Sequence, residues 1–118
     1  KQYNLVKEKI IGPYKSSQKN FFLAGDLNTE QNSEAFKKMI TLFELNNYPL
    51  NEENPYTFDS ENSWINYKNK GWIDYILYQI KPENKIINQY IIRPKMSYKN
   101  KPMDLADHYG IVLEIMMN

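Results

Sequence analysis

An uninterrupted apolar run, Phe21 to Ala24, ends directly at the polar tetrapeptide Gly25-Asp26-Leu27-Asn28. A run this short is typical of a β-strand that is covered on both faces. A carboxylate and an amide two residues apart at a strand end can point into one cleft, where they can activate water or contact a phosphoryl oxygen. The run therefore predicts a buried strand that leads into a polar site.

The first half of the chain otherwise shows helical spacing of its apolar residues. Tyr3 to Ile11 is expected to form a helix that stops at Gly12-Pro13. Ser33 is the expected N-cap of a second helix that runs to about Leu45. The buried stripe of this second helix is predicted to comprise Phe36, Met39, Ile40 and Phe43.

The second half is expected to consist of strands separated by polar loops. Strands are predicted at Tyr56 to Phe58, Trp72 to Ile80, Ile86 to Ile92 and Gly110 to Met117. Loops are predicted at Pro49 to Pro55, Ser60 to Gly71 and Lys95 to Ala106. Alternation of helical and strand segments without a repeat or a long linker indicates mixed α and β structure in one domain or part of one.

The composition excludes several kinds of site. The chain of 118 residues has no cysteine, so it has no disulfide scaffold, no thiolate zinc site and no cysteine nucleophile. A formal net charge of +1 argues against nucleic-acid binding through bulk charge. No apolar run approaches the roughly 20 residues of a membrane span.

Polar residues also interrupt or adjoin apolar strands at two later places. Together with the stretch Gly25 to Asn28, we call these places the three polar breaks. Asp74 lies inside the strand predicted at 72–80, and Asp107-His108 precedes the last strand. Histidine is suited to proton transfer near neutral pH, and a carboxylate can orient its ring. Each break also has a simpler explanation: an Asx turn at Asp26, an edge-strand surface at Asp74 and a packing histidine at His108. The order of the three breaks, rather than any one, points to a site.

The three breaks, taken with their flanking residues, resemble the endonuclease/exonuclease/phosphatase superfamily, which includes pancreatic deoxyribonuclease. The matching stretches are 22–28, 72–77 and 106–112. The resemblance implies an α/β (α+β) fold, the C-terminal half of a four-layer α/β-sandwich of the DNase I-like kind. Residues 1–118 would then be the C-terminal part of one such domain. Within the superfamily the chain is most similar to the neutral sphingomyelinases, on the stretches 56–59, 62–65 and 90–95.

The resemblance also implies a role for each polar residue. His108 would be the catalytic histidine, as general base or charged donor, and Asp74 would hold its tautomer. Asp26 would orient or deprotonate the attacking water, and Asn28 would hydrogen-bond the scissile phosphate. Asp107 would be a metal ligand, and the family metal is normally Mg²⁺, although other divalent cations are possible. The implied chemistry is in-line attack of water on phosphorus.

The implied activity is a metal-dependent phosphodiesterase that hydrolyses sphingomyelin to ceramide and phosphocholine. A nuclease or inositol-phosphate phosphatase of the same superfamily, and a truncated non-catalytic module, are the alternatives. We expect a phospholipid or membrane-surface substrate rather than nucleic acid. The resemblance favours a membrane-associated or secreted protein.

Family members supply a metal-binding glutamate from an N-terminal half that this chain does not include. We therefore expect that half to be the partner of this one, and the fragment alone to be inactive. Secreted bacterial sphingomyelinases carry a long aromatic hairpin between the last two motifs, and residues 94–107 are too few for it. Met96, Tyr98 and Met103 are either a weaker membrane contact or ordinary loop residues.

Overall fold

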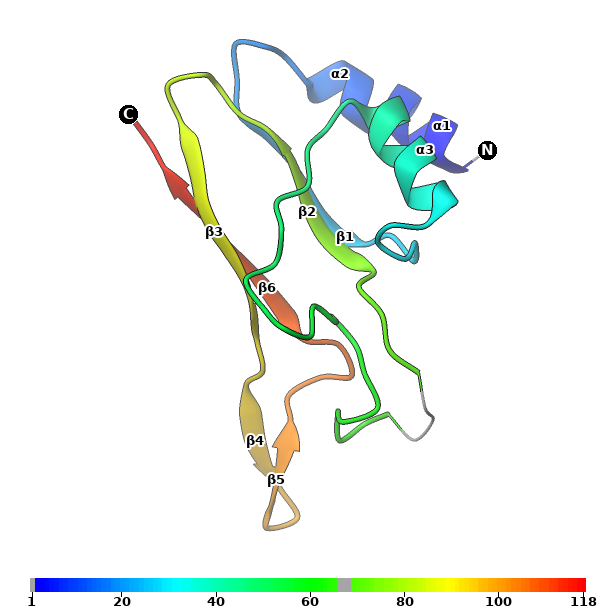
Figure 1. The fold of residues 1–118 in the computed structure, drawn as a ribbon, viewed down its shortest axis with the longest axis vertical. Helices are drawn as coiled ribbons and strands as arrows, with labels where there is room; N and C mark the ends of the chain where they lie inside the picture. The colour runs from blue at the N-terminus through cyan, green and yellow to red at the C-terminus, as the bar shows by residue number, and fades with distance from the viewer. Residues whose placement is uncertain (1, 66–68) are drawn as a thin grey trace.

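The computed structural model describes residues 2–65 and 69–118 and places helices at one end of the molecule and a hairpin at the other (Figure 1). The chain is elongated, with principal extents of 50 × 37 × 24 Å. The helical elements are α1 (Gln2–Val6), η1 (Lys7–Ile11, a π-helix), α2 (Gly12–Tyr14) and α3 (Glu34–Phe43). The strands are β1 (Phe21–Asp26), β2 (Asp74–Gln79), β3 (Lys85–Ile92), β4 (Lys95–Tyr98), β5 (Lys101–Asp104) and β6 (Gly110–Met116). None of the described helices has the length and hydrophobicity needed to cross a membrane.

The N-terminal helical segment does not stop at Gly12-Pro13, so that prediction is wrong. Gly12 keeps right-handed helical angles (φ −53°, ψ −48°), and its amide donates to the Lys7 carbonyl oxygen. This π-turn begins a new helical register in which Pro13 occupies the first turn, where its missing N–H is not needed. The segment ends at Lys15, which is extended (φ −75°, ψ 132°).

Helix α3 confirms the prediction for this segment. The Ser33 hydroxyl accepts a hydrogen bond from the Phe36 amide at 3.1 Å, as an N-cap does. The helix ends at Glu44, whose left-handed backbone (φ 52°) lets its amide donate to the Ile40 carbonyl oxygen. Phe36, Met39 and Phe43 are buried, and Ile40 is partly buried.

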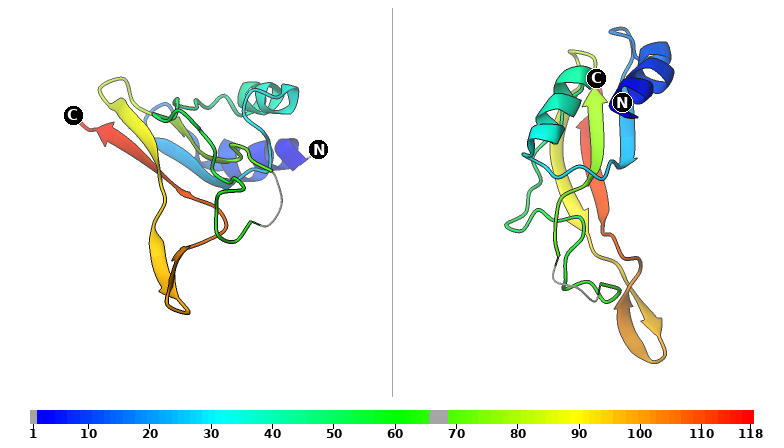
Figure 2. Two further views of the ribbon diagram at one scale, coloured as in Figure 1. Left: turned by 60° about the horizontal axis from the view of Figure 1, so that its bottom comes forward. Right: turned by 90° about the vertical axis from the view of Figure 1, so that its right-hand side faces the viewer.

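The strands pair as three antiparallel ladders, β1–β2, β3–β6 and β4–β5 (Figures 1 and 2). In the first ladder Phe21 lies opposite Gln79 and Asp26 lies opposite Asp74. The strand predicted from Trp72 begins at Asp74, so this carboxylate is the first residue of β2 rather than an interior one. Strand β3 and strand β6 confirm the predictions for the last third of the chain.

Two predictions for short segments are wrong. Residues 56–58 form no strand, only an isolated bridge between Phe58 and Gly71. The loop predicted from Lys95 contains the β4–β5 hairpin, because Lys99 and Asn100 both adopt left-handed angles (φ 51° and 62°), as a two-residue hairpin turn requires. Pro102 is tolerated because a two-stranded ribbon consists of edge strands. Of the loop predicted at 60–71, residues 66–68 lie outside the described residues.

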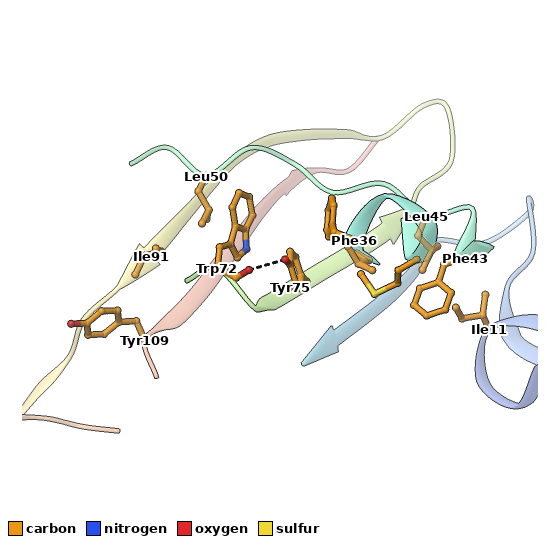
Figure 3. Packing of buried hydrophobic residues seen from close by; sticks show 11 residues of the cluster. Ile11, Phe36, Phe43, Leu45, Leu50, Trp72, Tyr75, Ile91 and Tyr109 are labelled. Carbon is orange, nitrogen blue, oxygen red and sulfur yellow. Dashed lines mark hydrogen bonds between the residues drawn. The ribbon is translucent and has the colours of Figure 1, made fainter. Parts of the chain in front are cut away.

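The hydrophobic core lies between the helices and one face of the strands. Tyr75 and Leu77 of β2 point into it, and the Tyr75 ring stacks on Phe36 of α3 with centroids 5.2 Å apart. Figure 3 shows the buried side chains as a continuous row from Tyr109 to Ile11. The row joins the helical end of the molecule to the residues next to His108.

The opposite face of β1 is not covered by the described residues. Phe22 and Ala24, which alternate with the inward-facing positions of β1, are exposed. The prediction of a strand covered on both faces is therefore wrong for this part of the molecule. Every second side chain of a strand lies on the same face, so Asp26 shares a face with Phe22 and Ala24. Asp74 lies on that face too, because it is directly opposite Asp26 in the antiparallel pair.

Candidate active site

The register of β1 and β2 brings two carboxylates together at one end of their ladder. Asp26 and Asp74 are direct cross-strand partners in this antiparallel pair. Like charges at such positions repel each other, so a cation or a proton donor beside them is favoured. Gly25, immediately before Asp26, has φ +150°, a backbone conformation that side-chain-bearing residues rarely adopt. The end of β1 is therefore shaped to present the first carboxylate.

His108 supplies the proton donor next to these carboxylates. Its Nδ1 lies 2.8 Å from Asp74 Oδ2, although 34 residues separate the two in sequence. Because an ionised carboxylate only accepts hydrogen bonds, Nδ1 carries the proton and Nε2 is left to exchange one with a ligand. The Phe58 ring stacks on the imidazole, with centroids 5.7 Å apart and planes 24° apart. The ring is thus held by a hydrogen bond at its edge and a packing contact on its face.

The pKa of His108 is raised above its ordinary value by these neighbours. Partial burial lowers the pKa, but the hydrogen bond from the ring to Asp74 outweighs it, with further contributions from the charges of Asp74, Asp107 and Asp26. All three carboxylates favour the protonated ring. The imidazolium form therefore persists to higher pH than in a free histidine.

The stability of the protein is expected to fall as pH rises through the raised pKa of His108. The unfolded ring titrates at about pH 6.5, so the stabilising contribution is complete below that pH and is lost as the folded ring deprotonates. The measurement is the thermal unfolding midpoint across neutral pH for the wild type and Asp74→Asn. The slope should be smaller in the variant, and equal slopes would contradict the ion pair.

Asn28 lies beside this cluster in a turn that Asp26 closes. The Asn28 amide donates to Asp26 Oδ1 at 2.8 Å, and Asn28 has a left-handed backbone (φ 49°). The simpler interpretation of this stretch, an Asx turn, is thus present in the structure. The same carboxylate also belongs to the cluster with Asp74 and His108, so the turn and the cluster coexist. The Asn28 side chain is exposed, which leaves its amide available to a ligand.

A metal ion has a plausible donor set at this point. Ligand atoms of Asp26, Asp74 and His108 all lie within 4.8 Å of one another, the one such group within residues 2–65 and 69–118. Asp107, which was predicted to be a metal ligand, is exposed beside His108 and is not a member of that group. Mg²⁺ needs only one or two carboxylates and keeps several waters, so the hard oxygen ligands present here fit it.

Several buried polar residues near the site carry no prediction from the sequence. Asp104 is 1% exposed and accepts hydrogen bonds from the Ser63 amide, the Ser63 hydroxyl and Lys95 Nζ. Asn62, 2% exposed, donates to the Ala106 carbonyl oxygen at 2.9 Å. These bonds attach the loop at Asn62 to the segment that ends at His108. In sequence both residues look like ordinary loop residues, and the only signal was that Asn62 belongs to the stretch similar to sphingomyelinases.

A search for similar proteins found a solved structure with the fold of this chain. No family model matches the chain, and no curated protein matches it significantly. A crystal structure of beta toxin from Staphylococcus aureus is similar to it, with a TM-score of 0.75 and 19% sequence identity. The match covers 96% of this chain and 43% of the beta toxin chain, so the chain spans less than half the length of that protein. The α+β fold of this chain is therefore that of a part of beta toxin.

Proposed function

We propose that this chain is part of a metal-dependent phosphodiesterase of the endonuclease/exonuclease/phosphatase superfamily that hydrolyses sphingomyelin to ceramide and phosphocholine. The observation that carries the proposal is the Asp74–His108 hydrogen bond beside Asp26, the residue that the β1–β2 ladder places opposite Asp74. A histidine oriented by one carboxylate, with a second carboxylate within reach, is the donor set that water attack on a phosphodiester needs. The shared fold with beta toxin supports the scaffold but not the substrate.

Each side chain has a defined part in this chemistry. Asp74 holds the Nδ1–H of His108, so Nε2 faces the substrate. Because the pKa of His108 is raised, the ring keeps its proton to higher pH than a free histidine does, and it donates this proton to the leaving ceramide oxygen. Asp26 accepts a proton from the attacking water, and the Asn28 amide donates to a phosphoryl oxygen. The bond from water oxygen to phosphorus forms as the bond to the ceramide oxygen breaks.

Asp26 would hold magnesium at this site, whereas Asp107 lies outside the group that Asp26 forms with Asp74 and His108. Magnesium bound at this site would neutralise part of the negative charge of the phosphate. The Asp26 carboxylate lies at the exposed end of β1, where a phosphate group can approach. The proposal thus assigns the acidic side chains to cation and water binding, and the histidine to proton transfer.

The uncovered face of the strands is proposed to pack against another segment of the same domain. Phe22, a large apolar side chain on this face of β1, is 41% exposed. Exposed apolar surface of this kind is costly unless something covers it. The similar beta toxin chain is more than twice as long, which leaves room in a shared fold for a covering segment. We propose that this segment also completes the metal site, so that the present chain is inactive alone.

The β4–β5 hairpin favours a membrane-surface substrate. It projects from the body of the molecule (Figure 2) and carries Lys99 and Lys101, with Tyr98 44% exposed beside them. Basic side chains next to an exposed aromatic ring suit the headgroup region of a phospholipid membrane. A protein with this surface fits a secreted or membrane-associated location. Basic residues also suit nucleic acid, so a nuclease on the same scaffold is the second candidate.

The test is a substrate panel on the complete natural protein that contains this sequence. Sphingomyelin vesicles, phosphatidylcholine vesicles, abasic duplex DNA and inositol polyphosphates are compared, each with magnesium and after chelation by EDTA. We expect turnover of sphingomyelin, loss of at least 100-fold on chelation, roughly the effect of losing a cation from the phosphate, and recovery on adding Mg²⁺. Turnover of DNA or inositol phosphates instead would keep the site and reject the lipid substrate. No turnover by a folded protein would favour a non-catalytic module.

A further inference from the structure

Thr57 lies wholly buried beside the first residues of β2. Its side chain is 0% exposed. Its Oγ1 accepts hydrogen bonds from the backbone amides of Ile73 at 3.1 Å and Asp74 at 3.2 Å. One hydroxyl therefore accepts hydrogen bonds from two consecutive backbone amides, and the second of them belongs to Asp74 itself. Leaving these amides without a partner is unfavourable, so this arrangement restrains the chain at Asp74.

The backbone of Thr57 is bonded to the chain next to His108, the hydrogen-bond partner of Asp74. The Tyr109 amide, one residue after His108, donates to the Thr57 carbonyl oxygen at 2.7 Å. The Thr57 amide donates to the Gly71 carbonyl oxygen at 2.9 Å. Thr57 thus bonds to the chain at Asp74 through its side chain and to the chain next to His108 through its main chain.

The residue that follows strengthens this link. Phe58 stacks on the His108 ring, so any movement of this segment also moves the face against which the imidazole packs. The hydrogen bond between Nδ1 and Oδ2 is directional, and small displacements weaken it. Residues Thr57 and Phe58 together therefore determine how the imidazole and the carboxylate meet.

We propose that Thr57 is a positioning residue that sets the relative placement of Asp74 and His108. The kinetic part of this inference rests on the proposed function, while the structural part does not. Thr57 is wholly buried, and its hydrogen bonds reach Asp74 and His108 only through the backbone on either side of the pair. Its hydroxyl is the element that distinguishes it from a valine of the same shape.

The kinetic test compares Thr57→Val with Thr57→Ser in the complete protein, using the substrate that the panel identifies. Valine keeps the β-branched shape and removes the acceptor, whereas serine keeps the acceptor. We expect kcat to fall about 10- to 100-fold in Thr57→Val with KM nearly unchanged, the usual effect of losing a partner that orients a functional side chain. Thr57→Ser should recover most of the loss. Thr41→Val removes an exposed hydroxyl on α3 and should leave kcat unchanged.

The second readout is spectroscopic and needs no substrate. At one fixed pH at which the ring is protonated, the Nδ1–H proton of His108 should resonate far downfield because of its bond to Asp74, with His108→Ala used to assign the signal. The resonance should shift upfield or broaden in Thr57→Val and return in Thr57→Ser. A merely structural threonine would lower the unfolding midpoint of Thr57→Val without changing this signal. If the substrate panel fails, this measurement still decides the positioning role.

The proposal is overturned if folded Thr57→Val keeps the wild-type Nδ1–H resonance, or if Thr57→Ser fails to restore it. Should Thr57→Val not fold, amide hydrogen exchange in the wild type and in Thr57→Ser replaces it. The amides of Ile73 and Asp74 should be protected in both proteins, because both keep the accepting hydroxyl. Exchange of these two amides at the rate of an open loop would also overturn the proposal.

Discussion

Replacing His108 with alanine is expected to lower phosphodiester turnover by about 10³-fold, within the range that general acid–base groups contribute. The ring makes its side-chain hydrogen bond to Asp74 and packs on Phe58, and 30% of its surface is exposed. Its loss removes the proton donor while the buried core stays unchanged. The measurement is kcat in the complete protein with the substrate that the panel identifies, beside the unfolding midpoint.

Two companion variants sharpen this prediction. Asp74→Asn should lose a similar factor, because an amide does not hold the charged imidazole as a carboxylate does. The double variant should be little worse than either single one, since groups that act as a unit give non-additive losses. Glu34→Gln, which removes an exposed charge on α3, should keep wild-type turnover. Losses that multiply in the double variant would contradict the pairing of His108 with Asp74.

Replacing Tyr75 with alanine is expected to lower the free energy of unfolding by about 3–5 kcal/mol, the cost of removing a large buried aromatic side chain. Tyr75 is 1% exposed, and its ring stacks between Phe36 and Trp72 (Figure 3). Its single hydroxyl hydrogen is shared between the carbonyl oxygens of Thr29 at 2.6 Å and Trp72 at 2.7 Å. Burial raises the pKa of this hydroxyl, so it stays a donor at every physiological pH.

Urea denaturation of the complete protein measures this loss, and two further tyrosine variants calibrate it. Tyr75→Phe keeps the ring and leaves two carbonyl groups short of a donor, so it should cost about 1–2 kcal/mol. Tyr14→Ala removes a side chain that is 71% exposed and should change stability by less than about 0.5 kcal/mol. A loss below about 1 kcal/mol in Tyr75→Ala would contradict the role of this ring in the core.

Local sequence signals predicted α3 well because each signal acts within a few residues. Ser33 can cap a helix only through an amide three positions on, and the buried stripe repeats at helical spacing. The N-terminal segment was mispredicted for a related reason. Gly12-Pro13 normally stops a helix, but a π-turn shifted the register so that Pro13 fell in a tolerated position. Nothing in the local pattern signals such a shift.

The hairpin at residues 95–104 shows the same limit for strands. Pro94 just before the hairpin, Pro102 within it and three lysines look like a loop, because proline lacks the amide that a ladder needs. The structure places Pro102 in an isolated two-stranded ribbon, where the missing amide costs little. Whether a strand is an edge depends on the neighbours that the fold places beside it, so a sequence pattern cannot decide it.

From the sequence alone came the α+β class, the capped helix, most strands, and the three polar breaks at Asp26, Asp74 and His108. These features depend on secondary-structure propensity, hydrophobic periodicity and residue type, all of which can be read within a few neighbouring residues. The tertiary structure alone decided that Asp26 opposes Asp74, that His108 bonds Asp74 rather than another carboxylate, and that Thr57 joins the chain at Asp74 to the chain next to His108. The Asp26–Asp74 pairing joins residues 48 positions apart and depends on strand register, which the packing of one sheet face selects. Local sequence patterns show which functional groups the chain has, and only the folded chain determines how these groups are arranged in space.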